Sequence, residues 1–466
     1  MLKKINIFSY IIMIISFILL TIGIVKLGMV PNKYLVIYFV ILGVISLILG
    51  LCSFLIKNKV VSVFLIVITL VISCSCFFTF GKVNQTDKFL TNINSKVQET
   101  SLYYVVVLKD SSINSINDLA SKRIGTNTTD SKNYDKSINI LDKSIKYDNV
   151  KYTNVLSLSN DLLEEKIDAI YISSSIKDML DEEYDGFSDK TKVIEEFKIN
   201  VDSSSSNKTV KSSDTFSIYI SGIDTYGSIS RVSRSDVNII MTVNPRENKI
   251  LLTTIPRDSY VRLHGTTGSK DKLTHAGIYG INMSKSTIED FLDIDIDYYV
   301  RVNFDSLIKI IDTIGGVNVN SDIAFTAQGY NFVVGYNKMD GKKALAFSRA
   351  RKQFAGGDRL RGQHQQAVIT AILEKVTSSR VLLGNYSEIL NGLSSAFQSD
   401  IPDSLIRDFV KDQLNDMKSW DIKSISVDGT GTYTTSTYSM PGWNLYVMIP
   451  DEDTVKNAHN LIVGME

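Results

Sequence analysis

The chain begins with a long apolar block and continues as a much more polar sequence. Three apolar runs cover residues 5–30, 34–56 and 60–81, and the short polar segments PNK and KNK separate them. Each run has about the 20 residues that a helix needs to cross a bilayer. The pattern therefore predicts that residues 1–81 form an anchor of three transmembrane helices.

Basic residues set the expected orientation of this anchor. Lys3 and Lys4 precede the first run, and Lys57 and Lys59 lie in the second short loop. Because lysine and arginine are enriched on the cytoplasmic side of membrane proteins, both segments are expected to be cytoplasmic. Three spans then place residues 82–466 outside the cell.

Residues 82–199 alternate between apolar strand-like runs and amphipathic helical segments. The pattern predicts a strand at 101–108, a short helix and a second strand within 112–126, and a helix followed by a strand within 155–173. This order resembles one lobe of an extracellular solute-binding protein, without the second lobe that would complete a cleft. We therefore expect an extracellular α/β accessory domain with a spacer or docking role.

A Ser-rich stretch at 200–214 is typical of a linker. Beyond it, the pattern predicts a second α/β domain over residues 215–390 and a C-terminal extension, 391–466, packed on that domain. The predicted strands of the domain at 215–390 are 215–224, 235–245 and 249–258, and its predicted helices are 286–294, 303–316 and 362–379.

Composition narrows the function classes that remain. The 50 Lys+Arg balance the 50 Asp+Glu, so no overall charge attracts nucleic acid and any electrostatic function is local. All three cysteines, Cys52, Cys74 and Cys76, lie in the apolar block, so the polar remainder has neither a disulfide framework nor a cysteine zinc site. No GxGxxG or GxxxxGK[ST] motif supports an ordinary nucleotide site.

Two aspartates lie at the ends of neighbouring predicted strands. Asp224 ends the first strand after the linker, and Asp236 begins the next one. Carboxylates placed in this way can converge on a hard cation such as magnesium, which also takes oxygen ligands from phosphate and water. Aspartate also often caps or terminates elements, and this structural interpretation stays open.

Arginines gather in three segments near predicted element ends. Arg234 precedes the second strand, and Arg257 follows the third, where a surface ion pair is the alternative interpretation. The stretch 347–366, FSRARKQFAGGDRLRGQHQQ, holds four arginines, and Arg349 and Arg351 would share one face of a strand. Guanidinium groups beside a helix N-terminus favour phosphate, although a solvated basic loop is the alternative. Acids and arginines together suit phosphoryl transfer.

Several motifs resemble the LytR-CpsA-Psr family. They are SGIDTYG, RSD, IPRDSYVRL, DKLTHAGIYG, LAFSRARKQFAGGD and RGQHQQAVI, in family order over about residues 215–380. The tail segment YSMPGWNLYVMIPD, the three spans and the extra domain resemble the CpsA-like, capsule-associated branch.

The resemblance implies a membrane-anchored phosphotransferase of the cell wall in Gram-positive bacteria. Such an enzyme moves a glycopolymer, capsular polysaccharide or teichoic-acid-like, from undecaprenyl pyrophosphate to peptidoglycan and releases undecaprenyl phosphate. The implied fold is a central mixed β-sheet flanked by helices, with an apolar pocket for the polyprenyl tail. Expected partners are the lipid-linked polymer, peptidoglycan, the membrane and other capsule assembly proteins, but not nucleic acid. A polyprenyl pyrophosphatase and a cell-envelope sensor or regulatory membrane protein are the alternatives.

The resemblance also assigns site residues. Magnesium, with manganese as an alternative, would be held by Asp224 and Asp236. The implied catalytic residues are Arg234, Asp236, Arg257 and Arg361. The implied pyrophosphate-binding residues are Arg234, Arg257, Arg349, Arg351, Arg361, Gln365 and Asp358.

The sequence departs from the commoner family pattern just after the last arginine. Arg359 and Gln366 are therefore left without an assigned role. His364 is expected at a helix surface rather than acting as a base, and His275 is expected to pack near the site without a catalytic role.

Overall fold

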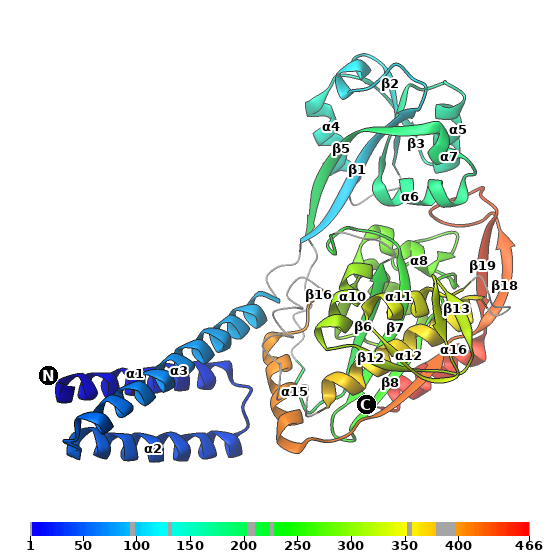
Figure 1. The fold of residues 1–466 in the computed structure, drawn as a ribbon. Coiled ribbons are helices and arrows are strands. Elements are labelled where there is room, and N and C mark those ends of the chain that lie inside the picture. The colour runs from blue at the N-terminus through cyan, green and yellow to red at the C-terminus, as the bar shows by residue number, and fades with distance from the viewer. Residues whose placement is uncertain are drawn as a thin grey trace.

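The structure is a computed structural model, and it shows an elongated group of helices beside two units that are each built around a β-sheet (Figure 1). It describes residues 2–93, 98–128, 133–202, 210–223, 228–351, 357–378 and 397–465. We call residues 98–202 the accessory unit and residues 210–465 the main unit.

Three long apolar helices form the N-terminal part of the chain. They are α1 (Leu2–Leu27), α2 (Asn32–Leu55) and α3 (Lys59–Ile93). Among the described residues, these three are long and apolar enough to cross a membrane. The third helix continues well past the apolar run that ends at residue 81, so much of the segment between that run and the accessory unit is helical.

The accessory unit is built on a five-stranded sheet of order β3-β2-β4-β1-β5. Strand β1 pairs antiparallel with β4 and β5, whereas β2 pairs parallel with β3 and β4. The elements confirm the strands and helices that the sequence predicts here. They are β1 (Gln98–Leu108), η1 (Ile116–Leu119), β2 (Arg123–Asn127), α4 (Tyr134–Ser144), β3 (Asp148–Tyr152), α5 (Val155–Leu163), β4 (Ala169–Ser173), α6 (Ser174–Glu183), α7 (Phe187–Lys190) and β5 (Thr191–Asp202).

The main unit is built on a six-stranded mixed sheet of order β16-β11-β6-β7-β8-β17. Its centre is formed by the three strands that the sequence predicts after the linker, paired antiparallel in chain order. The strands are β6 (Phe216–Ile223), β7 (Ser235–Asn244), β8 (Lys249–Thr254), β11 (Tyr298–Val302), β16 (Gln398–Ser399) and β17 (Asp421–Ser426).

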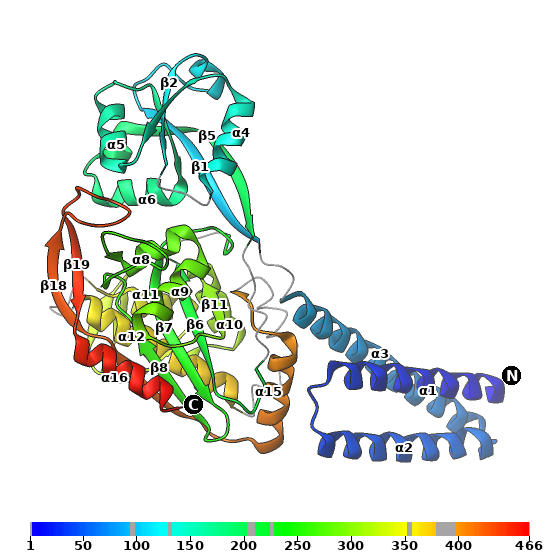
Figure 2. The ribbon, with the colours of Figure 1, turned by 180° about the vertical axis from the view of Figure 1, so that it is seen from behind.

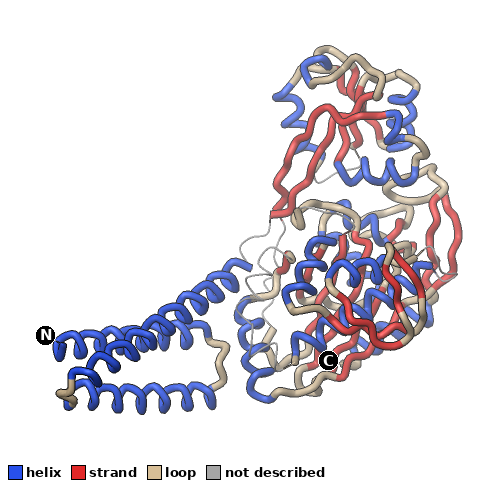
Figure 3. Tube along the Cα trace, in the orientation of Figure 1, coloured by secondary structure: helices blue, strands red, loops and turns tan. Residues whose placement is uncertain are grey.

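Helices cover both faces of this sheet (Figures 2 and 3). On one face, apolar side chains of α9 and α16 share a buried cluster with Tyr219 and Ile240 of the sheet. On the other face, Ile369 and Leu373 of α12 pack on strand residues such as Leu252. The helices of the main unit are α8 (Leu273–Ala276), η2 (Gly277–Tyr279), α9 (Ile281–Leu292), α10 (Phe304–Thr313), α11 (Gly341–Arg349), α12 (Gly357–Thr377), α15 (Asp403–Asp416) and α16 (Glu452–Val463).

The C-terminal segment is part of the main sheet. Strand β17 pairs parallel with β8, and β16 pairs antiparallel with β11, so both edge strands come from residues that the sequence suggested as an extension. Small two-stranded sheets complete the unit. They are formed by β9 (Tyr260–Val261) with β10 (Asp271–Lys272), β12 (Val317–Ser321) with β15 (Gly335–Met339), β13 (Phe325–Ala327) with β14 (Tyr330–Phe332), and β18 (Gly429–Thr434) with β19 (Leu445–Pro450).

The main unit also contacts the end of the helical anchor. Arg407 of α15 donates to the carboxylate of Asp87 in α3 at 3.0 Å and to the carbonyl of Leu27 at 2.7 Å. Lys26 pairs with the same carboxylate at 2.6 Å. These bonds join α15 to the ends of α1 and α3 that face the polar part of the chain.

Candidate active site

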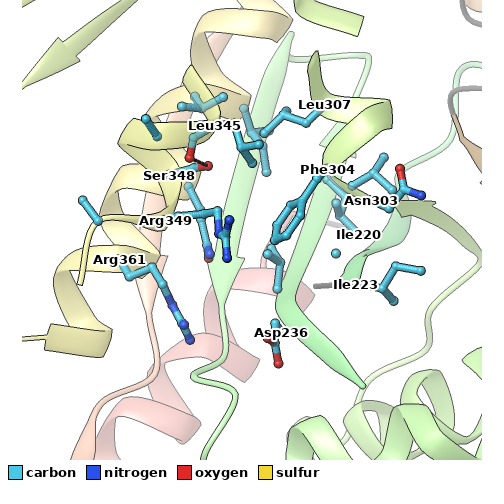
Figure 4. A pocket seen from close by; sticks show the side chains of 18 of the residues that line it. Ile220, Ile223, Asp236, Asn303, Phe304, Leu307, Leu345, Ser348, Arg349 and Arg361 are labelled. Atoms are coloured by element: carbon cyan, nitrogen blue, oxygen red, sulfur yellow. Dashed lines mark hydrogen bonds between the residues drawn. The ribbon is translucent and has the colours of Figure 1, made fainter. Parts of the chain in front are cut away.

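A deep cavity lies in the main unit between one face of the sheet and the helices α10, α11 and α12 (Figure 4). Its volume is about 710 Å³, and most of its wall is apolar. Leu307 and Leu345 lie at one end of the cavity, whereas Asp236 and Arg361 lie at the other. The apolar wall is formed chiefly by Ile220, Ile223, Val237, Met241, Val300, Val302, Phe304, Leu307, Ile310, Leu345, Val368, Ile369, Ile372 and Leu373.

Asp236 is the carboxylate at the polar end. It is the second residue of β7, it is buried, and its Oδ1 accepts hydrogen bonds from Arg257 Nη1 and Thr274 Oγ1, each at 3.0 Å. Burial alone would raise the pKa of this carboxyl, but the guanidinium groups of Arg257, Arg234 and Arg361 outweigh burial and lower the pKa to about 2. Asp236 is therefore ionised throughout the physiological range.

Arg257 and Arg234, which lie next to strand ends, both pair with the carboxylate of Glu182. Arg257, just after β8, donates to Glu182 at 3.4 Å, and Arg234, just before β7, pairs with the same side chain. Glu182 itself lines the cavity, although it belongs to α6 of the accessory unit. Arg234 does not line the cavity and reaches it through this ion pair.

Three further arginines and one glutamine come from the helical side of the cavity. Arg349, Arg351, Arg361 and Gln365 all line it. Arg361 and Gln365 are four residues apart in α12 and so project from the same helix face. Arg349 lies over the ring of Phe304, with 4.2 Å between the guanidinium carbon and the ring centroid.

The structure corrects the expectation that Arg349 and Arg351 share a strand. Arg349 is the last residue of helix α11, and Arg351 follows it. The helix forms because Asp340 caps it by accepting from the Lys343 N–H, while the apolar side of the turn around Phe347 is buried. Both arginines nevertheless reach the cavity.

The structure thus brings together Asp236, Arg257, Arg349, Arg351, Arg361 and Gln365, with Arg234 at the margin. Asp224 lies outside the described residues. Asp358 belongs to helix α12, and its side chain is outside the description.

Glu182 is the residue that sequence reasoning missed. The only signal was the acidic end of its helix, KDMLDEE, which lies far along the chain from the arginine motifs. Nothing in the sequence linked that helix to the site.

Comparisons with known proteins identify the group to which the chain belongs. The model of the LytR_cpsA_psr family matches residues 170–450. The chain belongs to the LytR_cpsA_psr family. A second model, NMT1/THI5 like, matches residues 87–200, which include the accessory unit except its last residues.

Curated relatives agree with this membership. The chain is 37% identical over 202 residues to the polyisoprenyl-teichoic acid–peptidoglycan teichoic acid transferase TagU of Enterococcus faecalis, a match that covers 43% of this chain and 66% of that relative. It is 35% identical over 235 residues to the protein of the same name from Bacillus subtilis, covering 49% of this chain and 74% of that relative. The crystal structure of B. subtilis TagV is 28% identical, covers 54% of this chain and 97% of that one, and has a TM-score of 0.47.

The departures from the commoner LytR-CpsA-Psr pattern have structural explanations. Arg359 is exposed and pairs with Asp428 at 3.2 Å, away from the cavity. Gln366 donates to the backbone carbonyls of Leu252 and Ile425 and so ties α12 to β8 and β17.

The two histidines of the site region are both buried. His364, expected at a helix surface, is instead buried and packs against the rings of Phe325 and Phe347, with centroids 4.9 and 4.3 Å away. Burial lowers its pKa to about 4, so it is neutral at pH 7. The expected surface position is therefore wrong. His275 Nδ1 lies 2.7 Å from Asp271 and 2.9 Å from Ser439, within the core.

The polar end fits a magnesium ion of the kind that the family resemblance implies. Magnesium usually takes one or two protein carboxylates and completes its shell with phosphate and water. Both hydrogen bonds that the described residues donate to Asp236 are accepted by Oδ1, which leaves Oδ2 to coordinate a cation. Within the described residues, no three His, Cys, Asp or Glu side chains are grouped as for a protein-only metal cage.

Proposed function

We propose that the chain is a membrane-anchored phosphotransferase that moves a glycopolymer from undecaprenyl pyrophosphate to peptidoglycan and releases undecaprenyl phosphate. The observation that carries the proposal is the cavity, which is apolar at one end and arginine-rich at the other. A polyprenyl pyrophosphate has the same division between an apolar tail and a compact anionic head.

The charges of the polar end suit that head group. Arg257, Arg349, Arg351 and Arg361 present guanidinium groups that bind phosphate oxygens in pairs, and Gln365 adds an amide. The names of the curated relatives, which describe transfer from a polyisoprenyl carrier to peptidoglycan, support the same substrate class.

Asp236 and Asp224 would hold a magnesium ion, or manganese in its place, and the bound ion would neutralise charge on the pyrophosphate oxygens. The arginines of the chain would orient the pyrophosphate and stabilise the charge that develops on its bridging oxygen.

In the proposed reaction, an acceptor sugar hydroxyl forms a bond to the sugar-proximal phosphorus. The bridging phosphorus–oxygen bond breaks, undecaprenyl phosphate leaves with the electron pair, and the hydroxyl proton passes to solvent. No covalent intermediate with the protein is needed, because positioning and charge compensation supply the catalysis.

The proposed topology places the N-terminus in the cytoplasm and the accessory and main units outside. The basic residues before the first helix and in the second short loop support this orientation. The bonds of Arg407 to the ends of α1 and α3 would hold the main unit close to the membrane that carries the lipid donor.

The decisive experiment uses the full chain in lipid vesicles with a polyprenyl-pyrophosphoryl oligosaccharide, magnesium and peptidoglycan. Wild-type protein should form wall-bound oligosaccharide, and Arg257→Ala and Arg361→Ala should reduce its yield at least a hundredfold. Arg359→Ala is the matched control and should leave the yield unchanged, since Arg359 lies outside the cavity.

Two results would contradict the proposal. Cleavage of the donor without any transfer to peptidoglycan would identify a pyrophosphatase. Undiminished transfer by Arg257→Ala and Arg361→Ala would place the chemistry elsewhere.

A further inference from the structure

The accessory unit lies against the polar end of the cavity with a row of acidic side chains on α6. Asp178 pairs with Arg231 at 2.9 Å, and Glu183 pairs with Lys272 at 3.3 Å. Neither of these cations lines the cavity. Glu182, which lies between these acids in the sequence, is the one whose partners are Arg257 of the proposed pyrophosphate site and Arg234 at its margin.

Apolar packing holds α6 in place independently of these ion pairs. Met179 and Leu180 are fully or almost fully buried in one cluster with Met440 and Trp443 of the main unit. The rings of Tyr184 and Trp443 also meet edge to face, with centroids 5.2 Å apart. A change confined to the Glu182 carboxylate therefore leaves the docking of the accessory unit intact.

Three carboxylates pair with Arg257, and they differ in how easily they can leave. Asp258 lies 3.6 Å from the Arg257 Nε and its side chain is 3% exposed, so it is fixed. Asp236 is 8% exposed and also accepts from Thr274, so it is fixed in the core of the site. The side chain of Glu182 is 40% exposed at the edge of the cavity, and rotation of its bonds can carry the carboxylate into solvent. Burial raises the pKa of Glu182, but Arg234 and Arg257 outweigh burial, so the group is ionised at neutral pH.

We infer that Glu182 determines the anion affinity of the site, because it occupies Arg234 and Arg257 until a pyrophosphate displaces it. This inference rests on the proposed function. A phosphate oxygen and the Glu182 carboxylate need the same guanidinium N–H groups, so they cannot both be bound there. The accessory unit thereby supplies a competitor within the same chain. This competitor weakens the binding of every anion that requires these two arginines, including the monophosphate product.

A competing role and a merely structural role of Glu182 predict different changes in donor affinity when the carboxylate is removed. Loss of a merely structural ion pair would weaken donor binding or leave it unchanged. Loss of a competitor lowers the KM for the lipid donor and tightens inhibition by the product, whereas kcat stays equal or falls as product release slows.

The test measures anion binding by the full chain in detergent. It compares wild-type protein with two variants that each carry one substitution near the end of α6. Inorganic pyrophosphate and farnesyl pyrophosphate are titrated calorimetrically, with magnesium, into wild-type, Glu182→Gln and the matched control Glu183→Gln. We expect both probes to bind Glu182→Gln about tenfold more tightly than wild-type. Glu183→Gln should stay within about twofold.

A third variant separates charge from shape. Glu182→Asp keeps the charge but shortens the side chain, so it should compete less well and give an intermediate affinity. Thermal melting of each variant provides the check on folding.

Equal or weaker binding by Glu182→Gln, with an unchanged melting temperature, would overturn the inference while leaving the proposed function intact. Absence of pyrophosphate binding by wild-type and every Glu182 variant would overturn both.

Discussion

Replacing His364 with phenylalanine should remove a large part of the acid sensitivity of the main unit. His364 is 5% exposed and packs against two phenylalanine rings, and burial lowers its pKa from 6.5 to about 4. Because the folded-state pKa is below the unfolded-state value, the unfolded chain takes up the proton first as the pH falls. The contribution of His364 to folding stability is therefore fully present above pH 6.5 and is lost as the pH falls towards 4. The difference between the two pKa values corresponds to about 3 kcal/mol.

The assay is urea unfolding of the detergent-solubilised chain between pH 7.5 and pH 4. The chain has two tryptophans, so a Trp443→Phe background leaves Trp420, which is stacked on Phe409 near the main sheet, as the reporter. Between these pH values, the parent should lose about 3 kcal/mol more unfolding free energy than His364→Phe, since all other titrating groups are shared. His264→Asn is the control for removal of an exposed histidine, since the His264 side chain is 52% exposed.

Parallel stability curves for the parent and His364→Phe would refute this reasoning. The same variant also tests catalysis, because loss of a general base would reduce transfer at pH 7 at least about a hundredfold. We expect transfer to be retained, since the His364 side chain is neutral at pH 7, buried and packed against aromatic rings.

Three further outcomes follow from the site geometry. Asp236→Asn should lower the unfolding free energy at pH 7 by about 2 kcal/mol, as measured by denaturant titration. The reason is that the lowered pKa of Asp236 stabilises the fold above pH 4, and this contribution is lost as the pH falls through about 2. Leu307→Trp should fill the apolar end of the cavity and raise the KM for a long polyprenyl donor more than for a farnesyl donor, as compared in transfer kinetics. Gly222→Ala should cost about 1–3 kcal/mol, because its Cβ would lie 2.6 Å from the Val237 side chain, and thermal melting reports the change.

The sequence was sufficient to predict the elements whose periodicity is strong. The three apolar runs became helices, and the strand patterns at 215–224, 235–245 and 249–258 became the centre of the main sheet. Local pattern failed at residues 345–351, where two alternating arginines suggested a strand. The Asp340 cap and the burial of Phe347 favour a helix there, and the arginine spacing carries no weight against them.

Pairings between distant segments could not be predicted from local pattern. The short strand β16 and the strand β17 look like parts of a separate extension along the chain, yet they hydrogen-bond to β11 and β8. Edge positions in a mixed sheet are decided by which segment can reach an open strand, and sequence periodicity does not contain that information.

One acidic partner of the site arginines also comes from a distant segment, so the equal numbers of acidic and basic residues did not locate the site. Arg257 has a side chain that is only 9% exposed, and a buried guanidinium group without a partner would be strongly destabilising. A site for an anionic substrate must therefore contain anions of its own when it is empty. Asp236 supplies one from the neighbouring strand, Asp258 supplies a second from the next position in the chain, and Glu182 supplies a third from the accessory unit. The two buried acids keep Arg257 oriented in every state, whereas the exposed Glu182 can move away from it. The arginine motifs therefore locate the site, but the three-dimensional structure is needed to identify the residue that competes for it.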